Sequence, residues 1–141
     1  MDSSIDRPPR LRYFTPVEAN TVLPRVRGLV HRAADCAQQI RASAQEMRER
    51  PELDHERLTR DIERLRAEIN DIVEHIAAEG VVVRGIEPAL LDFPALLNGR
   101  EVLLCWRTGE TLVSWWHGLS TGYAGRQPVD FEDLGPWEWC N

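Results

Sequence analysis

The sequence lacks long apolar runs. A helix that crosses a bilayer needs roughly 20 mostly apolar residues, and no stretch of this chain approaches that length. The N-terminal segment MDSSIDRPPR also lacks the apolar core of a secretory signal. We therefore expect a cytoplasmic protein that has no membrane partner.

An excess of basic residues is also missing. The chain has 17 basic residues against 23 acidic ones, which gives a formal net charge of −6. Proteins that bind nucleic acid or anionic membranes nonspecifically need a basic surface to neutralise phosphates. The charge therefore argues against nucleic acid as a partner.

Cysteine is scarce. The chain has three cysteines, Cys36, Cys105 and Cys140. This odd and sparse set does not indicate a disulfide framework, and it is typical of a reducing compartment. Neither CxxC nor HExxH spacing occurs, so no standard metal motif is present. We therefore expect no cofactor.

What the sequence does contain predicts one globular domain. Its composition, 43% hydrophobic and 28% charged, is ordinary for such a domain, and 141 residues can bury a core. Residues 1–12 are polar and include Pro8 and Pro9, so we expect a flexible tail. Residues 13–141 then form the domain.

Residues 13–80 carry a helical pattern. Thr15 can cap a helix that has Pro16 at its first position and Glu18 as the capping-box partner. Apolar residues then recur at alternating steps of three and four as far as about Arg50: Leu23, Val26, Val30, Ala33, Ala37, Ile40, Ala44 and Met47. Pro24 is expected to kink this helix or to split off a short first segment.

A second helix is predicted from about Asp54 to Glu79, with Gly80 ending it. Its apolar seam has the same alternation: Leu58, Ile62, Leu65, Ile69, Ile72 and Ile76. A turn at residues 51–53 would bring the two seams together as an antiparallel hairpin. Small residues on one helix would then face large ones on the other.

Residues 81–128 are predicted to form a β-hairpin cap. Val81, Val82 and Val83 form a short β-branched run, and residues 86–97 are irregular and contain two prolines. Asn98-Gly99 signals a turn. Strands at 101–107 and 111–117 would then flank a tight loop at 108–110.

The loop length decides which side chains share a sheet face. A two-residue loop would place opposed residues on the same face. One face would then carry Val102, Leu104, Trp106, Val113, Trp115 and His117, and the other Leu103, Cys105, Arg107, Leu112, Ser114 and Trp116. The first face is the more apolar and should pack on the start of the first helix. A three-residue loop with a bulge would reverse this relation.

The predicted fold is therefore α+β: a long antiparallel helical hairpin with a small antiparallel sheet packed at one end. Residues 129–141 form a C-terminal tail with Trp137 and Trp139. These tryptophans would close over the sheet or dock on a second subunit.

Several short motifs occur together and in order. They are YFTPVEAN from Tyr13, DFP from Asp92, GREV from Gly99, LCWR from Leu104, GE from Gly109, WH from Trp116 and GYAGRQP from Gly122. In these motifs the chain resembles an uncharacterised prokaryotic family catalogued as domain of unknown function 2203. The resemblance spans most of residues 13–128 and implies no particular activity.

The GYAGRQP motif is the first candidate site. Glycines there permit positive φ, so backbone amides could surround an anion, and an arginine could bind it in a bidentate manner. The candidate ligand-binding residues are Arg126, Arg100, Arg107, Asp92, Gly122, Gly125 and Trp116. Alternatively, the glycines serve tight turns, and Arg126 pairs with Asp92, Glu101 or Glu110 to hold the loop.

His117, Cys105 and Glu110 are the candidates for acid–base or nucleophilic catalysis. The predicted hairpin opposes both pairings, because Cys105 and His117 lie on opposite faces, and Glu110 and His117 lie at opposite ends of one strand. The alternative is a buried Cys105 and a His117 bonded to backbone. A metal at His117 with Asp92, Glu110 or Cys140 has suitable ligand types but no supporting spacing.

The leading hypothesis is a non-enzymatic homodimer or partner-binding module with an Arg/His-lined anion pocket in the β cap. Two copies of the helical hairpin would form a bundle and bury more apolar surface. One alternative is a small hydrolase or transferase that uses His117 as acid/base and Arg126 to hold an anionic substrate. The other is a metal-binding protein that uses His117 with carboxylates.

Overall fold

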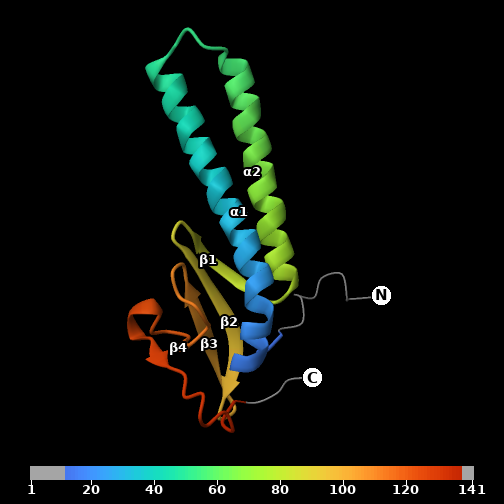
Figure 1. Ribbon diagram of the computed structural model, residues 1–141, viewed down its shortest axis with the longest axis vertical. Coiled ribbons are helices and arrows are strands. Elements are labelled where there is room, and N and C mark those ends of the chain that lie inside the picture. The colour runs from blue at the N-terminus through green and yellow to red at the C-terminus, as the bar shows by residue number, and fades with distance from the viewer. Residues whose placement is uncertain (1–11, 138–141) are drawn as a thin grey trace, which may run out of the picture.

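The computed structural model describes residues 12–137 and has the predicted α+β architecture: a helical hairpin stands on a five-stranded antiparallel sheet (Figure 1). The elements are α1 Pro16–Glu49, α2 His55–Ala78, β1 Val82–Ile86, β2 Ala89–Leu97, β3 Arg100–Arg107, β4 Trp115–Gly118, the 3-10 turn η2 Tyr123–Gly125, and β5 Gln127–Pro128. In the described part of the chain, no helix has both the length and the apolarity to cross a membrane.

The start of α1 is a capping box, as predicted. The Glu18 amide donates to Thr15 Oγ1 at 3.1 Å, and the Thr15 amide donates to Glu18 Oε1 at 3.1 Å. The expected split at Pro24 does not occur, because α1 is continuous through it. Leu23 and Val26 are buried in the core on either side of the proline, and this packing holds the helix together.

The second helix also begins and ends as predicted. Asp54 accepts a hydrogen bond from the Arg57 amide at 3.1 Å, and Gly80 adopts a φ of 89° just after the helix. Such a left-handed residue is the usual C-terminal stop. The helices are buried only near the sheet: on α1 no residue beyond Cys36 is fully buried, and on α2 none before Leu65.

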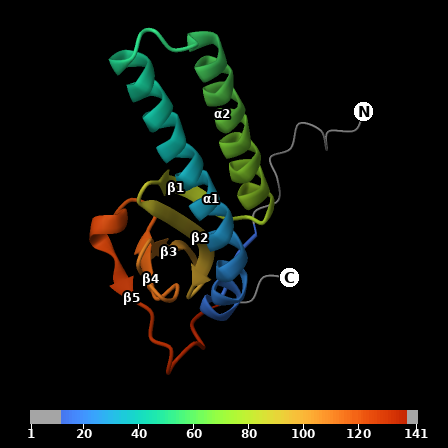
Figure 2. The ribbon, with the colours of Figure 1, turned by 45° about the horizontal axis from the view of Figure 1, so that its top comes forward.

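The strands lie in the order β1-β2-β3-β4-β5, and the helices cover one face of the sheet (Figure 2). Alternate strand residues on this helix-facing face are fully apolar and join the core: Leu91, Phe93, Ala95, Val102, Leu104 and Trp106. Phe14, just before α1, packs edge-on against Phe93 with ring centroids 5.4 Å apart. The start of α1 is therefore fixed to the middle of the sheet.

The prediction that residues 86–97 are irregular is wrong. They contain β2, a nine-residue strand that includes Pro94. Pro94 lies beyond the last β1 partner, Asp92, and its carbonyl accepts a hydrogen bond from the Phe14 amide at 2.7 Å. A strand residue's amide and carbonyl point to the same side. The missing Pro94 amide therefore faces a side where β1 offers no partner.

Asn98-Gly99 is a turn, as predicted, and it joins β2 to β3. Asn98 has a φ of 51° and Gly99 a φ of 77°. Two successive positive φ values are those of a type I′ hairpin turn. Leu97 consequently pairs with Arg100, and the register continues to Leu90 opposite Arg107.

The predicted tight hairpin between residues 101–107 and 111–117 is wrong. The strands do pair, but residues 108–114 lie between them, and β4 begins only at Trp115. Both backbone groups of Val113 are bonded to the side chain of Asn20 on α1, at 2.8 and 3.0 Å. This clamp holds the segment before β4 against the helix and out of the sheet.

The longer connection reverses the predicted faces. Leu103 pairs with His117, and Cys105 pairs with Trp115. Opposed residues in an antiparallel sheet share a face, so His117 lies on the same face as Cys105. Trp115 and Trp116 still lie on opposite faces, as predicted. Trp116 packs on Trp137, with ring centroids 6.3 Å apart.

The C-terminal segment closes over one end of the sheet as far as it is described. Trp137 is buried and forms an isolated bridge with Leu97. This matches the first of the two roles predicted for the tryptophans. Trp139 lies outside the described residues, as does the predicted flexible tail up to residue 11.

Candidate functional site

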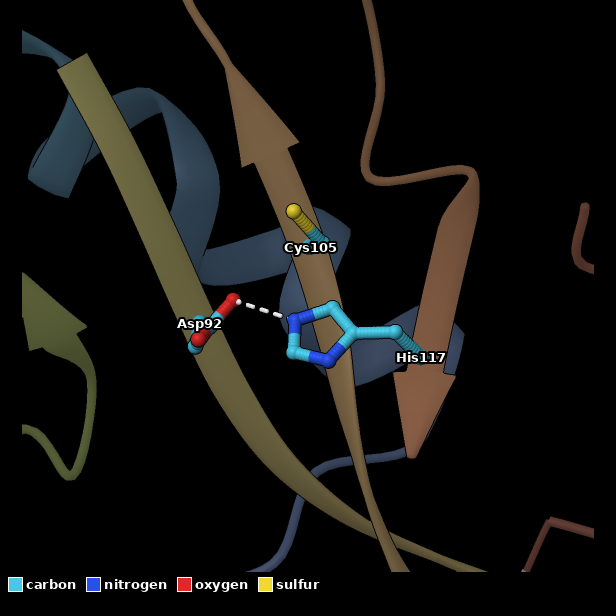
Figure 3. Close-up of side chains that lie close together, drawn as sticks. All are labelled: Asp92, Cys105 and His117. Atoms are coloured by element: carbon cyan, nitrogen blue, oxygen red, sulfur yellow. Dashed lines mark hydrogen bonds and ion pairs between the residues drawn. The ribbon is translucent and has the colours of Figure 1, made fainter. Parts of the chain in front are cut away.

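The face of the sheet away from the helices, here called the outer face, gathers polar residues from three adjacent strands. Asp92 on β2, Cys105 on β3 and His117 on β4 point toward one another, as Figure 3 shows. All three are buried, and their ligand-type atoms lie within 4.8 Å of one another. The separation of Cys105 and His117 predicted from the sequence is therefore wrong.

The hydrogen bonds of His117 determine where its protons lie. Nδ1 is 2.8 Å from the carbonyl oxygen of Gly118, which can only accept, so Nδ1 carries a proton. Nε2 lies 3.2 Å from Asp92 Oδ1. A hydrogen bond between these two atoms requires a proton between them, because two lone pairs would repel. Both ring nitrogens are therefore engaged.

Asp92 is held from two sides. Besides His117, it accepts a hydrogen bond from Arg84 Nε on β1 at 3.0 Å. The Asp92 side chain is only 4% exposed, whereas that of Arg84 is 52% exposed. A buried carboxylate requires such partners, since burying it alone would be costly. Arg84 thus joins the buried pair to solvent.

Cys105 is not set up as a nucleophile. Burial, reinforced by the negative charge of Asp92, raises the pKa of its thiol to about 11. Nucleophilic cysteines instead have a lowered pKa and a base with a free nitrogen. Here both nitrogens of His117 have other partners. In this arrangement neither ring nitrogen of His117 is free to accept the proton of the Cys105 thiol.

Arg126 lies in an ion pair. Its Nη1 is 2.9 Å from Glu110 Oε2, and its guanidinium stacks 4.7 Å from the ring of Trp115 and 4.2 Å from that of Tyr123. Glu110 also accepts from the Arg107 amide at 2.7 Å. The geometry matches the alternative prediction, in which Arg126 pairs with Glu110 and holds the loop. The hydrogen bonds of the Glu110 carboxylate go to Arg107 and Arg126.

The other residues of the predicted anion site do not converge on one place. Gly122 lines a pocket together with Asp92 and His117, whereas Arg100 and Trp116 line a different pocket. Arg107 lies 5.6 Å from the ring of Tyr123, whereas Arg100 is at the opposite end of β3, and Trp116 is on the helix-facing side. Gly122 and Gly125 bracket a 3-10 turn, in which a Cβ on Gly125 would lie 2.7 Å from Thr121. At Gly125, the glycine is therefore required for a tight turn.

Two adjoining pockets on the outer face form what is here called the outer groove. The larger, of about 520 Å³, is mainly apolar, and the smaller, of about 290 Å³, is lined by Asp92 and His117. Both are bordered by Arg84, Leu103 and Leu119. The apolar lining comes from the end of α2, the sheet and the loop after β4: Val73, Ala77, Val82, Pro94, Leu103 and Leu119.

Sequence reasoning missed Arg12, Arg84 and Leu119, all of which line this groove. Arg84 carries a visible signal, because it interrupts an otherwise apolar run, VVVRGI, at a position that alternates with Val82. Strand alternation would have placed it on the same face as Val82. Arg12 and Leu119 lie in segments with no periodic pattern.

Residues 12–129 match the model of the family described as "Uncharacterized conserved protein (DUF2203)". This chain belongs to that family. The matched range includes the whole helical hairpin, the outer groove and the Asp92–Cys105–His117 cluster. Searches of curated proteins and of solved structures gave no significant match.

Proposed function

We propose that this protein is a non-enzymatic binding module whose ligand has an apolar body and a single carboxylate. The observation that carries the proposal is the outer groove, in which an apolar pocket of about 520 Å³ adjoins a polar one. Small-molecule sites typically combine an apolar lining with a few fixed polar groups. Leu119, 60% exposed at the rim, offers further apolar surface to a bound molecule.

The charges at the groove favour an anion. Arg12 and Arg84 line the larger pocket, and Glu101 is the one acidic residue among its lining residues. In the smaller pocket, Asp92 is already paired with Arg84 and His117. An arginine that is half exposed can rotate to meet a carboxylate with paired hydrogen bonds. This retains the predicted Arg/His-lined anion pocket, with different arginines.

Calorimetric titration with decanoate, 2-naphthoate and the uncharged analogue 2-naphthol tests this function. We expect both carboxylates to bind, and 2-naphthol to bind at least about tenfold more weakly, since a charged hydrogen bond contributes about 1.5 kcal/mol or more. Failure of all three probes to bind would overturn the proposal. Equal binding of 2-naphthol and 2-naphthoate would overturn the role of the arginines.

Two exposed leucines provide a matched pair of variants. Leu119→Ala removes apolar surface at the groove and should weaken binding of 2-naphthoate severalfold. Leu112→Ala, at a residue that is 49% exposed and lies outside the groove, should leave it unchanged. Equal effects of the two substitutions would place the bound probe elsewhere.

Self-association through the helices is a second proposal. The outer half of the helical hairpin has apolar seam residues that are only half-buried: Ile40, Ala44, Met47, Leu58 and Ile62. A second copy would cover them by forming a four-helix bundle. We expect light scattering to give twice the chain mass of 16.2 kDa and Ile62→Glu to give the monomer. A monomeric unmodified protein at micromolar concentration contradicts this.

The geometry gives less support to the enzyme alternative. Arg126, which was to hold the substrate, does not line the pocket that His117 lines. His117 has no free ring nitrogen with which to accept a proton from a substrate. A hydrolase or transferase would need this network to rearrange before the first step.

A further inference from the structure

The buried cluster on the outer face combines three different ligand types. A carboxylate, a thiol and an imidazole come from the neighbouring strands β2, β3 and β4 (Figure 3). Carboxylate oxygen, thiolate sulfur and imidazole nitrogen are the ligands that Zn²⁺ takes in proteins. We propose that Asp92, Cys105 and His117 form a binding site for a zinc-class divalent cation.

The spacing of the donor atoms suits such an ion. With bond lengths of about 2.0 to 2.3 Å and tetrahedral angles, the donors around zinc lie about 3.3 to 3.8 Å apart. The donor atoms here lie within 4.8 Å of one another, and Nε2 and Oδ1 are 3.2 Å apart. Side-chain adjustments of about 1 Å bring them to the required distances.

The surroundings fix two of the three ligands. The Nδ1 proton of His117 is donated to the carbonyl of Gly118, which orients the ring so that Nε2 faces the cluster. Arg84 binds the second oxygen of Asp92 and leaves Oδ1 directed inward. Hydrogen bonds of this kind, from outside the ligand set, orient metal ligands in known sites.

The binding step balances in protons. The ion replaces the proton shared by Nε2 and Oδ1 and the proton of the Cys105 thiol, and both protons leave to solvent. Asp92 and His117 line the smaller pocket of the outer groove, so the ion and the protons have a path. Water in this pocket could supply a fourth ligand.

The carboxylate ligand proposed above is not required for this inference. Without a metal, the hydrogen bonds of Asp92 go to Arg84 and His117, and the Cys105 thiol has no part in them. If Cys105 serves only as a small apolar residue, no metal will bind through it. The experiment therefore has to distinguish a metal-binding Cys105 from one that only packs as a small apolar residue.

The test uses the full chain carrying Cys36→Ala and Cys140→Ala, so that Cys105 is the only thiol. The protein is freed of metal with a chelator and titrated with Co²⁺, which takes zinc sites and reports a thiolate bond as an ultraviolet charge-transfer band. We expect one Co²⁺ per chain with this band, and its loss when Zn²⁺ is added. Absence of the band would overturn the proposal.

Single-ligand variants give the second measurement. In the same background, Cys105→Ser should abolish the band and lower Zn²⁺ affinity by about 100-fold or more, the upper end of losses known for supporting groups. Asp92→Asn and His117→Gln should each weaken it similarly. Arg84→Lys, which keeps the positive charge but loses the Nε donor that orients Asp92, should cost up to about tenfold. Zn²⁺ affinity unchanged in Cys105→Ser would place the ion elsewhere.

Folding failure of a variant does not obscure the result. The charge-transfer band is first measured in the double cysteine variant, in which all three proposed ligands are intact. The melting temperature of that variant should rise with added Zn²⁺, because the ion binds only the folded chain. The melting temperature of the Cys105→Ser variant, measured in the same way, should not rise when Zn²⁺ is added. An equal rise in both would overturn coordination by Cys105.

Discussion

The two faces of the sheet are built from the same strands but differ in composition: one is wholly apolar along β2 and β3, and the other mixes apolar with polar residues. Toward the helices, β2 and β3 present Leu91, Phe93, Leu104 and Trp106, all at most 1% exposed. Toward the outside, the alternating positions of these strands include Asp92 and Cys105. One face therefore contributes apolar burial, and the other holds a polar cluster beside a groove.

The helix-facing side of the sheet mainly provides stability, whereas the outer face carries the groups capable of chemistry. The helix-facing side is packed against α1, so its residues gain free energy by leaving water. Within residues 12–137 no second layer of helices covers the outer face, and its buried charges are balanced by one another. Substitutions on the two faces should consequently differ in both size and kind.

The largest expected effect comes from the helix-facing side. Phe93→Ala removes a ring that is fully buried between β3 and Phe14, and it should lower the free energy of unfolding by about 3 to 5 kcal/mol. Val82→Ala, on the outer face, should cost about 1 kcal/mol or less. Urea denaturation of both variants measures the difference. Equal losses would remove the distinction between the faces.

The next effect tests the polar pairing of the outer face in metal-free protein. Asp92→Ala leaves Nε2 of a buried His117 without a partner and should cost about 1 to 3 kcal/mol. Asp92→Asn should cost less, because its amide can donate to Nε2 of a neutral ring. Thermal melts in excess chelator compare the two. If Asn is as harmful as Ala, charge rather than hydrogen bonding holds the pair.

A smaller effect is expected where the loop after β4 is attached. Glu110→Gln weakens the ion pair with Arg126, whose side chain is 13% exposed, and should cost about 1 kcal/mol. Hydrogen exchange of residues 119–126 should accelerate with it. Glu132→Gln, at an exposed residue, is the control and should change neither quantity.

The smallest effect concerns the edge where α1 meets the β1–β2 turn. Hydrogen bonds from Arg41 lower the pKa of Glu87 from its ordinary value of 4.5. A carboxyl whose folded pKa is lowered stabilises the fold above its unfolded pKa, and this contribution disappears as pH falls through the folded value. The melting temperature of Glu87→Gln should therefore lie slightly below that of the unmodified protein at neutral pH. The two should coincide in acid.

The helical hairpin could be predicted because its signals are local. Thr15 and Glu18 bond each other within one turn, and Gly80 ends α2 through its own backbone conformation. The Asn98-Gly99 turn is equally self-contained. Each of these depends on residues that are neighbours in the sequence.

The strands could be predicted only in part because their partners are distant. Pro94 suggested irregular chain, yet it is tolerated where β1 has ended and Phe14, 80 positions earlier, donates to its carbonyl. Asn20 withdraws Val113 from the sheet across 93 positions. No local pattern announces either contact.

The candidate site could also be predicted only in part, because it depends on how these strands pair. The residue types were identified, since Asp92, Cys105, His117, Glu110 and Arg126 were all named from the sequence. Their grouping was not, because shifting the start of β4 moves His117 to the other face of the sheet. Glu110 and Arg126 consequently form one pair, while Asp92 and His117 form another.

The Asn20 clamp has a consequence for how the molecule could be monitored. Val113 belongs to no strand, yet its amide proton is held by a helix side chain at 2.8 Å. Its rate of exchange with solvent therefore reports whether the start of α1 is seated, and not whether the sheet is intact. Two residues later the chain enters β4, which carries His117. The exchange rate of the Val113 amide thus measures the contact through which the helical hairpin holds the segment that leads to the polar cluster.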